Sequence, residues 1–447
     1  MLRVAVVGSG PAGVYAAEAL TRYAGDVSID VIDSLPAPYG LVRYGVAPDH
    51  PLTQSIANAL AQVLEQPGVR FLGNIAVGTD VSLDELREHY DAVVVAIGAA
   101  VDRRLGIPGE DLPGSVSATD LVAWYGGHPD TPPDRFRLDA RSVAVVGAGN
   151  VASDVARMLA RSTDELRPTD VPDHVLGAFD ASLVEDVHLV ARRGPAQARF
   201  TTRELRELGD LADADVLVDQ ADLELDEVST EALATAPAAR RNVDVLRRWA
   251  ERPAAGRRRR VHLHFFARPV AVLGSDRVTG LRVERTRFEP DGSLVGTGDE
   301  RDLPAQMVVR AVGYRSLPLA GLPFDERAGV VPHDEGRVHR DGVGLPGTYV
   351  AGWAKRGPTG VIGTNKHDAR ETVRTLLADV PDLPPAPVRD PAALPRLLAE
   401  RGVEVVTWGG WSAIEAAETE RGRLRGGDRV KISDRDELLR LAAREQD

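Results

Sequence analysis

The sequence predicts an α/β protein with two parallel-sheet domains, the second inserted into the first. Two similar runs predict this fold, VAVVGSGPAG at 4–13 and VAVVGAGNVA at 143–152. Each is a buried strand that leads through a Gly-rich turn into a helical segment, so that backbone N–H groups can approach a pyrophosphate at a helix N-terminus. The apolar segment 345–353 follows and is typical of a strand that returns to the first domain. We therefore expect two Rossmann-like dinucleotide-binding domains, a discontinuous one over 1–104 and 315–447 and an inserted one over 105–314.

The first domain opens with a βαβ unit. Ala content and apolar spacing predict a helix over 14–20, and alternation predicts a strand over 27–32. This strand ends at Asp33, 20 residues after Gly13, and an acid at that spacing normally hydrogen-bonds an adenosine ribose. The alternative is a solvated acid at a strand end. The later elements expected are a short helix opened by a capping box at 82–85, a buried strand over 91–99 and a turn-rich connector over 107–114.

The second domain repeats the pattern. Ala152 stands where a third glycine is usual, and Ala there still allows a helix to pack closely on its strand. In chain order, we expect a helix at 151–159, an irregular Asp- and Pro-rich stretch at 161–185, strands at 187–191, 262–266 and 280–285, and a closing run at 307–314. Beyond the return strand, we expect a loop at 360–363, a helix from about Asn365, a Pro-rich linker at 381–391 and a polar helical tail.

Composition narrows the function classes. The chain has no cysteine, which excludes disulfides, thiolate nucleophiles, protein-ligated iron–sulfur clusters and CxxC redox pairs. No apolar run approaches the roughly 20 residues that span a bilayer, and the first strand begins directly after Met1-Leu2-Arg3. We therefore expect a cytoplasmic protein with no signal peptide. The net charge of −13 argues against nucleic acid as a partner.

Arg192 and Arg193 indicate whether the second nucleotide is NAD or NADP(H). They follow the strand at 187–191, where NAD favours an acid, whereas a ribose 2′-phosphate needs cations and bidentate donors. Two arginines and no acid favour NADP(H), and an exposed basic turn is the alternative. The N–H groups of 150–153 and the Asn150 side chain are expected to hold the NADP pyrophosphate.

Two polar residues have a purely structural alternative. Glu204 lies in TTRE at 201–204, a capping box, so that it either caps a helix or has a role in catalysis. His50, in PDHP at 48–51, sits just before an expected helix and is open to the same two interpretations.

An arginine-rich segment stands out on an acidic protein. Nine arginines lie between 240 and 260, against only Asp244 and Glu251. Four of them recur at a spacing of seven and are expected on one helix face: Arg240, Arg241, Arg247 and Arg248. This face either docks an acidic partner, whose encounter it would accelerate, or is simply solvated.

Five stretches together point to a known family. They are YGLVRYGVAPDH at 39–50, GNVASDVAR at 149–157, RRG at 192–194, GW at 352–353 and GPTGVIG at 357–363. With these motifs, the chain resembles ferredoxin–NADP reductases of the adrenodoxin reductase type, especially their actinobacterial relatives, over nearly all of its 447 residues. It departs at Asp33, where relatives often carry Glu, and in the docking arginines, which match only loosely.

The resemblance implies FAD in the first domain and NADP(H) in the second. FAD would contact Ala12, Asp33, Leu41, Val77, Trp353, Gly360, Val361 and Ile362. NADP would contact Arg103, Asn150, Val151, Ala152, Ser153, Arg192, Arg193, Glu204 and Gly360. The cofactor-binding set is completed by Val46 and by the turn residues Gly8, Gly10, Gly13, Gly147 and Gly149. The resemblance also implies that His50 and Glu204 lie near the nicotinamide and take part in electron transfer, and that Arg240, Arg241, Arg247 and Arg248 help to dock an iron–sulfur partner.

The expected enzyme is therefore a ferredoxin–NADP(+) reductase with no metal site of its own. It would transfer a hydride from C4 of NADPH to N5 of FAD and then two single electrons to an acidic ferredoxin-type protein. One alternative is an NADPH-dependent flavin oxidoreductase that acts on a small molecule such as a quinone or an amine. Another is a non-catalytic FAD- and NADP-binding module that senses redox state.

Overall fold

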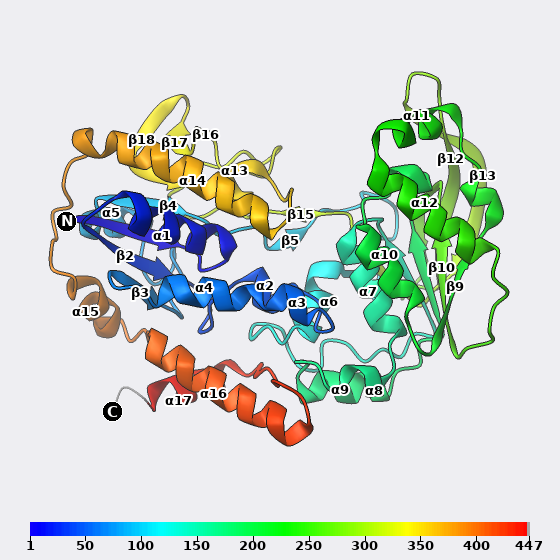
Figure 1. The fold of residues 1–447 in the computed structure, drawn as a ribbon, viewed down its shortest axis with the longest axis horizontal. Coiled ribbons are helices and arrows are strands. Elements are labelled where there is room, and N and C mark those ends of the chain that lie inside the picture. The colour runs from blue at the N-terminus through cyan, green and yellow to red at the C-terminus, as the bar shows by residue number, and fades with distance from the viewer. Residues whose placement is uncertain (445–447) are drawn as a thin grey trace. The chain divides into compact units, whose positions relative to one another are not determined.

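The structure is a computed structural model in which residues 1–444 are described. The chain divides into two compact units, one of residues 1–101, 126–130 and 314–447, the other of residues 102–125 and 131–313 (Figure 1). The sequence-based boundaries lie after 104 and after 314. The segment 126–130, expected in the inserted domain, is grouped with the first unit. Among the described helices, none combines the length and apolar character needed to cross a membrane.

The first unit is built on a seven-stranded sheet in the order β16-β17-β18-β4-β1-β2-β3, counted over residues 1–444. Its strands are β1 (Leu2–Val7), β2 (Val27–Ile32), β3 (Val69–Leu72), β4 (Ala92–Val95), β16 (His333–Asp334), β17 (Arg337–Arg340) and β18 (Val343–Val350). The return strand β18 pairs in parallel with β4, with Thr348 opposite Val93. The prediction of a discontinuous first domain is therefore confirmed.

Both faces of this sheet are buried. Along β1, Val4 and Val6 belong to one hydrophobic cluster, and Ala5 and Val7 belong to another. Such a sheet needs helices on both sides, and a continuous apolar run is its sequence signature. The helices of the unit are α1 (Pro11–Tyr23), α2 (Leu41–Tyr44), α3 (Pro51–Gln54), α4 (Ile56–Leu64), α5 (Leu83–His89), α13 (Trp353–Arg356), α14 (Ile362–Asp379), α15 (Ala393–Glu400), α16 (Trp408–Arg425) and α17 (Arg435–Ala443). In Figure 1, α1 and α14 run side by side, in agreement with their many contacts.

The second unit repeats this plan on a smaller parallel sheet, with the order β6-β14-β7-β8-β10-β9 over the described residues. Its strands are β6 (Ser115–Ser117), β7 (Ser142–Val146), β8 (Asp186–Val190), β9 (Ala214–Val218), β10 (Arg259–His264) and β14 (Met307–Arg310). An antiparallel sheet of β11 (Ala267–Leu273), β12 (Gly280–Phe288) and β13 (Leu294–Pro304) is added to it. The helices are α6 (Ala118–Tyr125), α7 (Asn150–Ala160), α8 (Thr163–Leu166), α9 (Asp173–Asp180), α10 (Thr202–Gly209), α11 (Glu227–Thr235) and α12 (Pro237–Ala250). Where the chain passes between the units, β5 (Val101–Asp102) pairs with β15 (Tyr314–Arg315).

The expectation of an irregular stretch over 161–185 is wrong. The stretch contains α8 and α9, and α8 is opened by a complete capping box between Ser162 and Glu165. Pro172 is the N-cap residue of α9, which buries Val175 and Phe179. The Asp and Pro residues that suggested irregularity are instead typical of helix starts.

Candidate functional site

The first Gly-rich turn, between β1 and α1, leaves no room for a side chain at Gly8 or Gly13. A Cβ on Gly13 would lie 1.8 Å from the carbonyl oxygen of Gly8, and Gly8 itself has a φ of 110°. The N-cap residue Gly10 offers no side-chain cap, and the first turn of α1 has no acidic residue. The N–H groups of a 13-residue helix therefore face an uncapped end, which suits a pyrophosphate.

Asp33 lies beside this turn and is bonded to it. Its Oδ2 accepts hydrogen bonds from the backbone N–H of Ser9 (2.7 Å) and from Ser9 Oγ (2.5 Å), and its Oδ1 accepts one from the N–H of Leu35 (3.0 Å). Burial raises the pKa of the Asp33 carboxyl, and the donors at Ser9 and Leu35 oppose that rise. A carboxylate accepts about four hydrogen bonds, so that it keeps capacity for a ribose hydroxyl.

Two segments distant in sequence pack against the same turn. The first is the segment of residues 39–46, which contains the short helix α2; we call it the flavin loop because FAD is expected to contact it. A Cβ on its Gly40 would lie 3.1 Å from the Cα of Gly10. The second lies between β18 and α13, where a Cβ on Gly352 would lie 2.5 Å from the Cβ of Ala12. The fold therefore gathers the expected FAD residues from three parts of the chain.

The remaining expected FAD residues lie around this arrangement with different exposure. Leu41 and Val46 are half-buried in the flavin loop, and Val77 packs against the hydrophobic cluster that contains Val7. Val361 is 67% exposed at the start of α14, and Ile362 is half-buried. Trp353, at the start of α13, contacts Tyr314 with the two rings tilted by 35° and their centres 5.5 Å apart.

Two side chains of α13 keep buried donors without a partner among the described residues. One is the Nε1 of Trp353, and the other is the guanidinium of Arg356, whose Nε and Nη1 are unpaired although its Nη2 donates to Asn365. Because an unpaired buried donor is costly, these donors and the glycine cradle fit a bound cofactor with acceptor groups. Sequence reasoning missed Arg356. Its signal was its position between the GW and GPTG motifs.

The second Gly-rich turn, between β7 and α7, has the same construction. Gly147 has a φ of 150°, and a Cβ there would lie 2.4 Å from the carbonyl oxygen of Ala311. Gly149 is the N-cap residue of α7 without a side-chain cap, and the first turn of α7 has no acidic residue. Ala152 and Ser153 are fully buried beneath the turn. This helix N-terminus is thus also open to an anion.

The Asn150 side chain has a structural partner that the sequence did not indicate. Its Oδ1 accepts a 2.9 Å hydrogen bond from the backbone N–H of Thr201, and the N–H of Arg199 donates to the carbonyl of Ala148 (2.7 Å). These bonds tie the segment before α10 to the second turn. The amide oxygen of Asn150 therefore orients the site, rather than only binding a ligand.

Arg192 and Arg193 follow β8, the neighbour of β7, at the carboxyl end of the sheet. Both side chains are exposed, and within residues 1–444 neither has an ion-pair partner. The backbone carbonyls of both residues are held, by Thr286 Oγ1 (2.7 Å) and by the N–H of Phe266 (3.1 Å). Arg103 is also exposed in this unit, and its N–H donates to the carbonyl of Gly313 (2.8 Å).

Glu204 caps its helix only in part. Thr201 Oγ1 accepts a hydrogen bond from the N–H of Glu204 (3.3 Å), which is one half of a capping box. The other half would need the Glu204 carboxylate on the N–H of Thr201, and Asn150 occupies that donor. The carboxylate instead lies 3.2 Å from Nη1 of Arg157, a fully buried arginine of α7.

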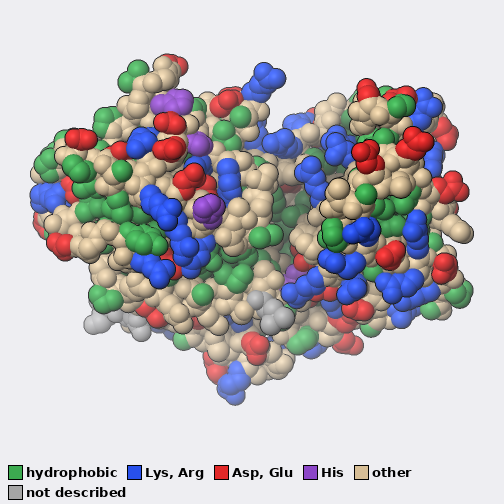
Figure 2. Space-filling model, turned by 45° about the horizontal axis from the view of Figure 1, so that its top comes forward, with side chains coloured by type: hydrophobic (Ala, Val, Ile, Leu, Met, Phe, Trp, Pro, Cys, Tyr) green, Lys and Arg blue, Asp and Glu red, His purple; other side chains and the backbone are tan. Residues whose placement is uncertain are grey.

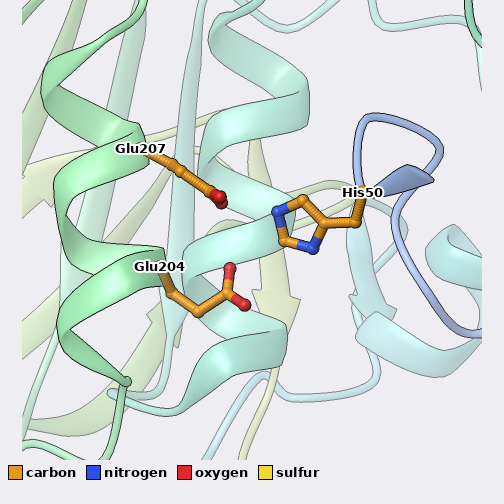
Figure 3. Close-up of side chains that lie close together, drawn as sticks. All are labelled: His50, Glu204 and Glu207. Atoms are coloured by element: carbon orange, nitrogen blue, oxygen red, sulfur yellow. The ribbon is translucent and has the colours of Figure 1, made fainter. Parts of the chain in front are cut away.

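Arg157 gathers a small group of carboxylates within the second unit. Its Nη2 lies 2.8 Å from Asp154, and its Nη1 lies 3.5 Å from Glu207. Figure 3 shows Glu204 and Glu207 projecting from the same side of α10. His50, also labelled there, is buried in the first unit just before α3, where its carbonyl accepts the N–H groups of Thr53 and Gln54. Glu204 and His50 thus each take part in a structural contact at a helix start. A role of either residue in catalysis stays a prediction.

The four expected docking arginines are all exposed on α12, and two of them line a pocket. Arg240 and Arg247 line a shallow pocket of about 280 Å³ with Leu233, Val243 and Asp244. Arg241 and Arg248 are not part of its lining, and Arg248 Nε donates to the carbonyl of Asp244 (3.1 Å). In Figure 2, acidic side chains are interspersed with basic ones over the face in view. One pair of these arginines thus lines the pocket, and the role of all four in docking stays a prediction.

Comparison with known proteins decides the family. A model of the pyridine nucleotide-disulphide oxidoreductase family matches residues 2–209. The NADPH-ferredoxin reductase FprA of Mycobacterium tuberculosis is 43% identical, with 98% of each chain covered. The mitochondrial NADPH:adrenodoxin oxidoreductase of Arabidopsis thaliana is 41% identical, with 99% of this chain and 95% of the relative covered. The chain belongs to the NADPH–ferredoxin reductase family.

Solved structures agree with this assignment. FprA from Mycobacterium tuberculosis in complex with NADPH superposes with a TM-score of 0.93 at 42% identity, covering 99% of each chain. The members of this family are flavoprotein oxidoreductases that use FAD and NADP(H). The resemblance, the fold class, the oxidoreductase class and the cofactor pair expected from the sequence are thereby confirmed.

Proposed function

We propose that this protein transfers electrons from NADPH, by way of bound FAD, to a ferredoxin-type iron–sulfur protein. The observation that carries the proposal is the pair of open helix N-termini, at α1 and at α7, each with a different polar group beside it. A carboxylate accompanies the first and two free arginines follow the strand next to the second. Relatives that match the full length are named NADPH-ferredoxin reductases.

The first unit supplies the FAD site. Gly8, Gly10 and Gly13 leave backbone N–H groups for the pyrophosphate, and Asp33 accepts from the adenosine ribose. The flavin loop and the GW segment at 352–353 close on the same turn. When bound, FAD supplies the chemistry that links a two-electron donor to a one-electron acceptor.

The second unit supplies the NADPH site. The N–H groups at the start of α7 hold the pyrophosphate, and Arg192 and Arg193 pair with the 2′-phosphate through charge-assisted, bidentate hydrogen bonds. Asn150 keeps the segment before α10 in place through Thr201. In this proposal, Glu204 and His50 act at the nicotinamide, where they orient it and stabilise charge.

The second unit also presents the docking surface for an acidic partner. Arg240 and Arg247 flank a pocket that Leu233, Val243 and Asp244 also line, so that the pocket carries a net positive charge over an apolar base. Opposite charges would accelerate association at low ionic strength. The cytoplasmic location expected from the sequence stays a prediction.

Anaerobic mixing of the FAD-loaded protein with NADPH in a stopped-flow instrument tests the proposal. We expect rapid bleaching of the flavin absorbance, followed by reduction of cytochrome c when ferredoxins of the same organism are added one by one. A flavin that stays oxidised would leave only the redox-sensing module. Bleaching without transfer to any ferredoxin, but with quinone turnover, would replace this proposal by the small-molecule reductase.

A further inference from the structure

The structure assigns a positioning role to Glu418, a fully buried residue of α16. We infer that it holds the flavin loop in its binding conformation through an ion pair with Arg43, so that the C-terminal helices serve the cofactor site. The inference rests on the proposed FAD site, since it gives a purpose to the geometry of that loop. Nothing in the sequence pattern of the helical tail indicates this role.

The flavin loop starts in a conformation that needs support. Tyr39 has a φ of 82° and Gly40 a φ of 50°, and a positive φ is strained for a bulky residue such as tyrosine. The N–H of Tyr39 donates to the carbonyl of Ser9 (3.1 Å), which brings Gly40 against Gly10 of the pyrophosphate turn. Such strain persists only where the surroundings hold the backbone in place.

A buried ion pair between Arg43 and Glu418 holds the flavin loop in place. The two nitrogens Nη1 and Nη2 of Arg43 donate to Oε2 and Oε1 of Glu418 at 3.0 Å and 2.5 Å. The guanidinium also lies 5.0 Å from the ring centre of Tyr44 and 5.0 Å from that of Trp411. Arg43 is 5% exposed, so that this bidentate pair is shielded from water and fixes one geometry.

The segment that follows α16 adds two further hydrogen bonds to Arg43 and Glu418. Lys431 Nζ donates to the carbonyl of Arg43 (2.7 Å), and the N–H of Ile432 donates to Oε1 of Glu418 (2.8 Å). Trp411 packs edge-on against Tyr39 with ring centres 5.8 Å apart. Both the side chain and the backbone of Arg43 are thus bound by residues 411–432, far along the chain.

We interpret the Arg43–Glu418 ion pair as fixing the geometry of the flavin loop rather than as adding to the stability of the fold. A buried ion pair contributes little net stability, because desolvation offsets its attraction, but loss of one partner leaves an uncompensated charge. A loop already in its bound conformation loses less entropy when the ligand binds. We therefore expect the pair to control how tightly FAD is retained.

The variant Glu418→Gln tests the inference, with Glu420→Gln as the matched control. Glu420 lies on the same helix, and its carboxylate forms an exposed bidentate pair with Arg423 at 2.6 Å and 2.8 Å. FAD release is followed by the recovery of flavin fluorescence, and amide hydrogen exchange is measured on FAD-free protein. We expect Glu418→Gln to release FAD about tenfold faster, and Glu420→Gln to match the wild type.

Hydrogen exchange separates positioning from general destabilisation. The amides of residues 39–46 should exchange faster in Glu418→Gln, and those of β1 should not change. Equal acceleration in both segments, or release as slow as in the control, would overturn the inference. If the wild type retained no FAD, the proposed function would fail, and exchange in the loop would still decide this role.

A second variant covers the case in which Glu418→Gln does not fold. Lys431→Met removes the donor to the carbonyl of Arg43 and leaves the ion pair intact. We expect FAD release about threefold faster than in the wild type, with faster exchange confined to residues 39–46. Unchanged release and exchange in this variant would also count against the inference.

Discussion

Asn150, the first residue of α7, accepts a 2.9 Å hydrogen bond from the backbone N–H of Thr201, the N-cap residue of α10. One side chain thereby sets the position of two helices of the proposed NADPH site. The bond also explains why Glu204 does not complete a capping box, since its usual donor is already taken. The carboxylate of Glu204 lies instead 3.2 Å from Nη1 of Arg157.

Replacement of this side chain should affect binding more than folding. We expect Asn150→Ala to destabilise the protein by at most about 1 kcal/mol, because one solvent-exposed hydrogen bond is lost. The KM for NADPH should rise several-fold, since α10 and its Glu204 lose their anchor. Thermal unfolding and steady-state kinetics measure the two effects, and an unchanged KM would show that the anchor has no role in the site.

The nucleotide preference should depend on Arg192 and Arg193. Arg192→Gln combined with Arg193→Gln should lower kcat/KM for NADPH by about 100-fold, because two charge-assisted contacts to the 2′-phosphate are lost. The value for NADH should change little. Arg141→Gln is the control, since this exposed arginine lies at the opposite end of β7. Equal losses with both nucleotides would refute the 2′-phosphate role.

The docking surface should act on the protein partner alone. Charge reversal at Arg240 and Arg247 should raise the KM for ferredoxin by about tenfold at low salt and less at high salt. Reduction of ferricyanide, a small acceptor, should not change. Arg277→Glu, at an exposed turn before β12, controls for net charge. If ferredoxin kinetics matched this control, the pocket on α12 would not be the docking site.

Gly352 should be required for stability and for FAD binding because of its close packing as well as its positive φ. It has a φ of 74°, and a Cβ there would lie 2.5 Å from the Cβ of Ala12. Gly342 has a φ of 80° with open space around it, so that Gly342→Ala measures the backbone strain alone, about 1 kcal/mol. Gly352→Ala should cost more and should lower the FAD content of the purified protein. Equal stability and equal FAD content in the two variants would show that the contact with Ala12 is not needed.

A cluster of histidines in the second unit should make stability depend on pH. His188 Nδ1 lies 3.0 Å from His264 Nε2, and Asp186, Arg260, His262 and Arg301 surround the pair. Burial lowers the pKa of His188 to about 4 and that of His264 to about 3. Unfolded histidines bind protons below about pH 6.5, so the unfolded state takes up more protons and stability falls as the pH drops from 6.5 towards 4.

Urea unfolding at pH 7 and pH 4.5 measures this dependence. We expect His264→Gln to remove a part of the acid-induced loss on the order of 1 kcal/mol, because a neutral amide has no proton to gain. His367→Gln is the control, since this histidine is exposed. A pH dependence identical in the wild type and in both variants would assign the acid loss to other groups.

The sequence predicted the fold and the glycine turns because both follow from local rules. A buried strand, a Gly-rich turn and a helix are adjacent in sequence, and a Cβ at Gly8 or Gly147 would collide with the backbone. The partners of Asn150 and Arg43 escaped prediction because Thr201 is 51 residues from Asn150 and Glu418 is 375 residues from Arg43. Which polar groups meet across such distances depends on packing and not on local pattern. The helices α8 and α9 were missed for another reason, since their capping residues are also those of loops.

The pairing of β18 with β4 sets an order for the assembly of the first unit. Thr348 lies opposite Val93, and the whole inserted unit is synthesised between them. On the ribosome, β1 to β4 emerge first, and the backbone groups at the free edge of β4 then have no strand to pair with. The inserted unit has all its strands available once residue 313 has emerged. The first unit closes only when β18 arrives, and the flavin loop is secured later still, when α16 leaves the exit tunnel. From the proposed FAD site we therefore expect this chain to bind its cofactor late in its biosynthesis.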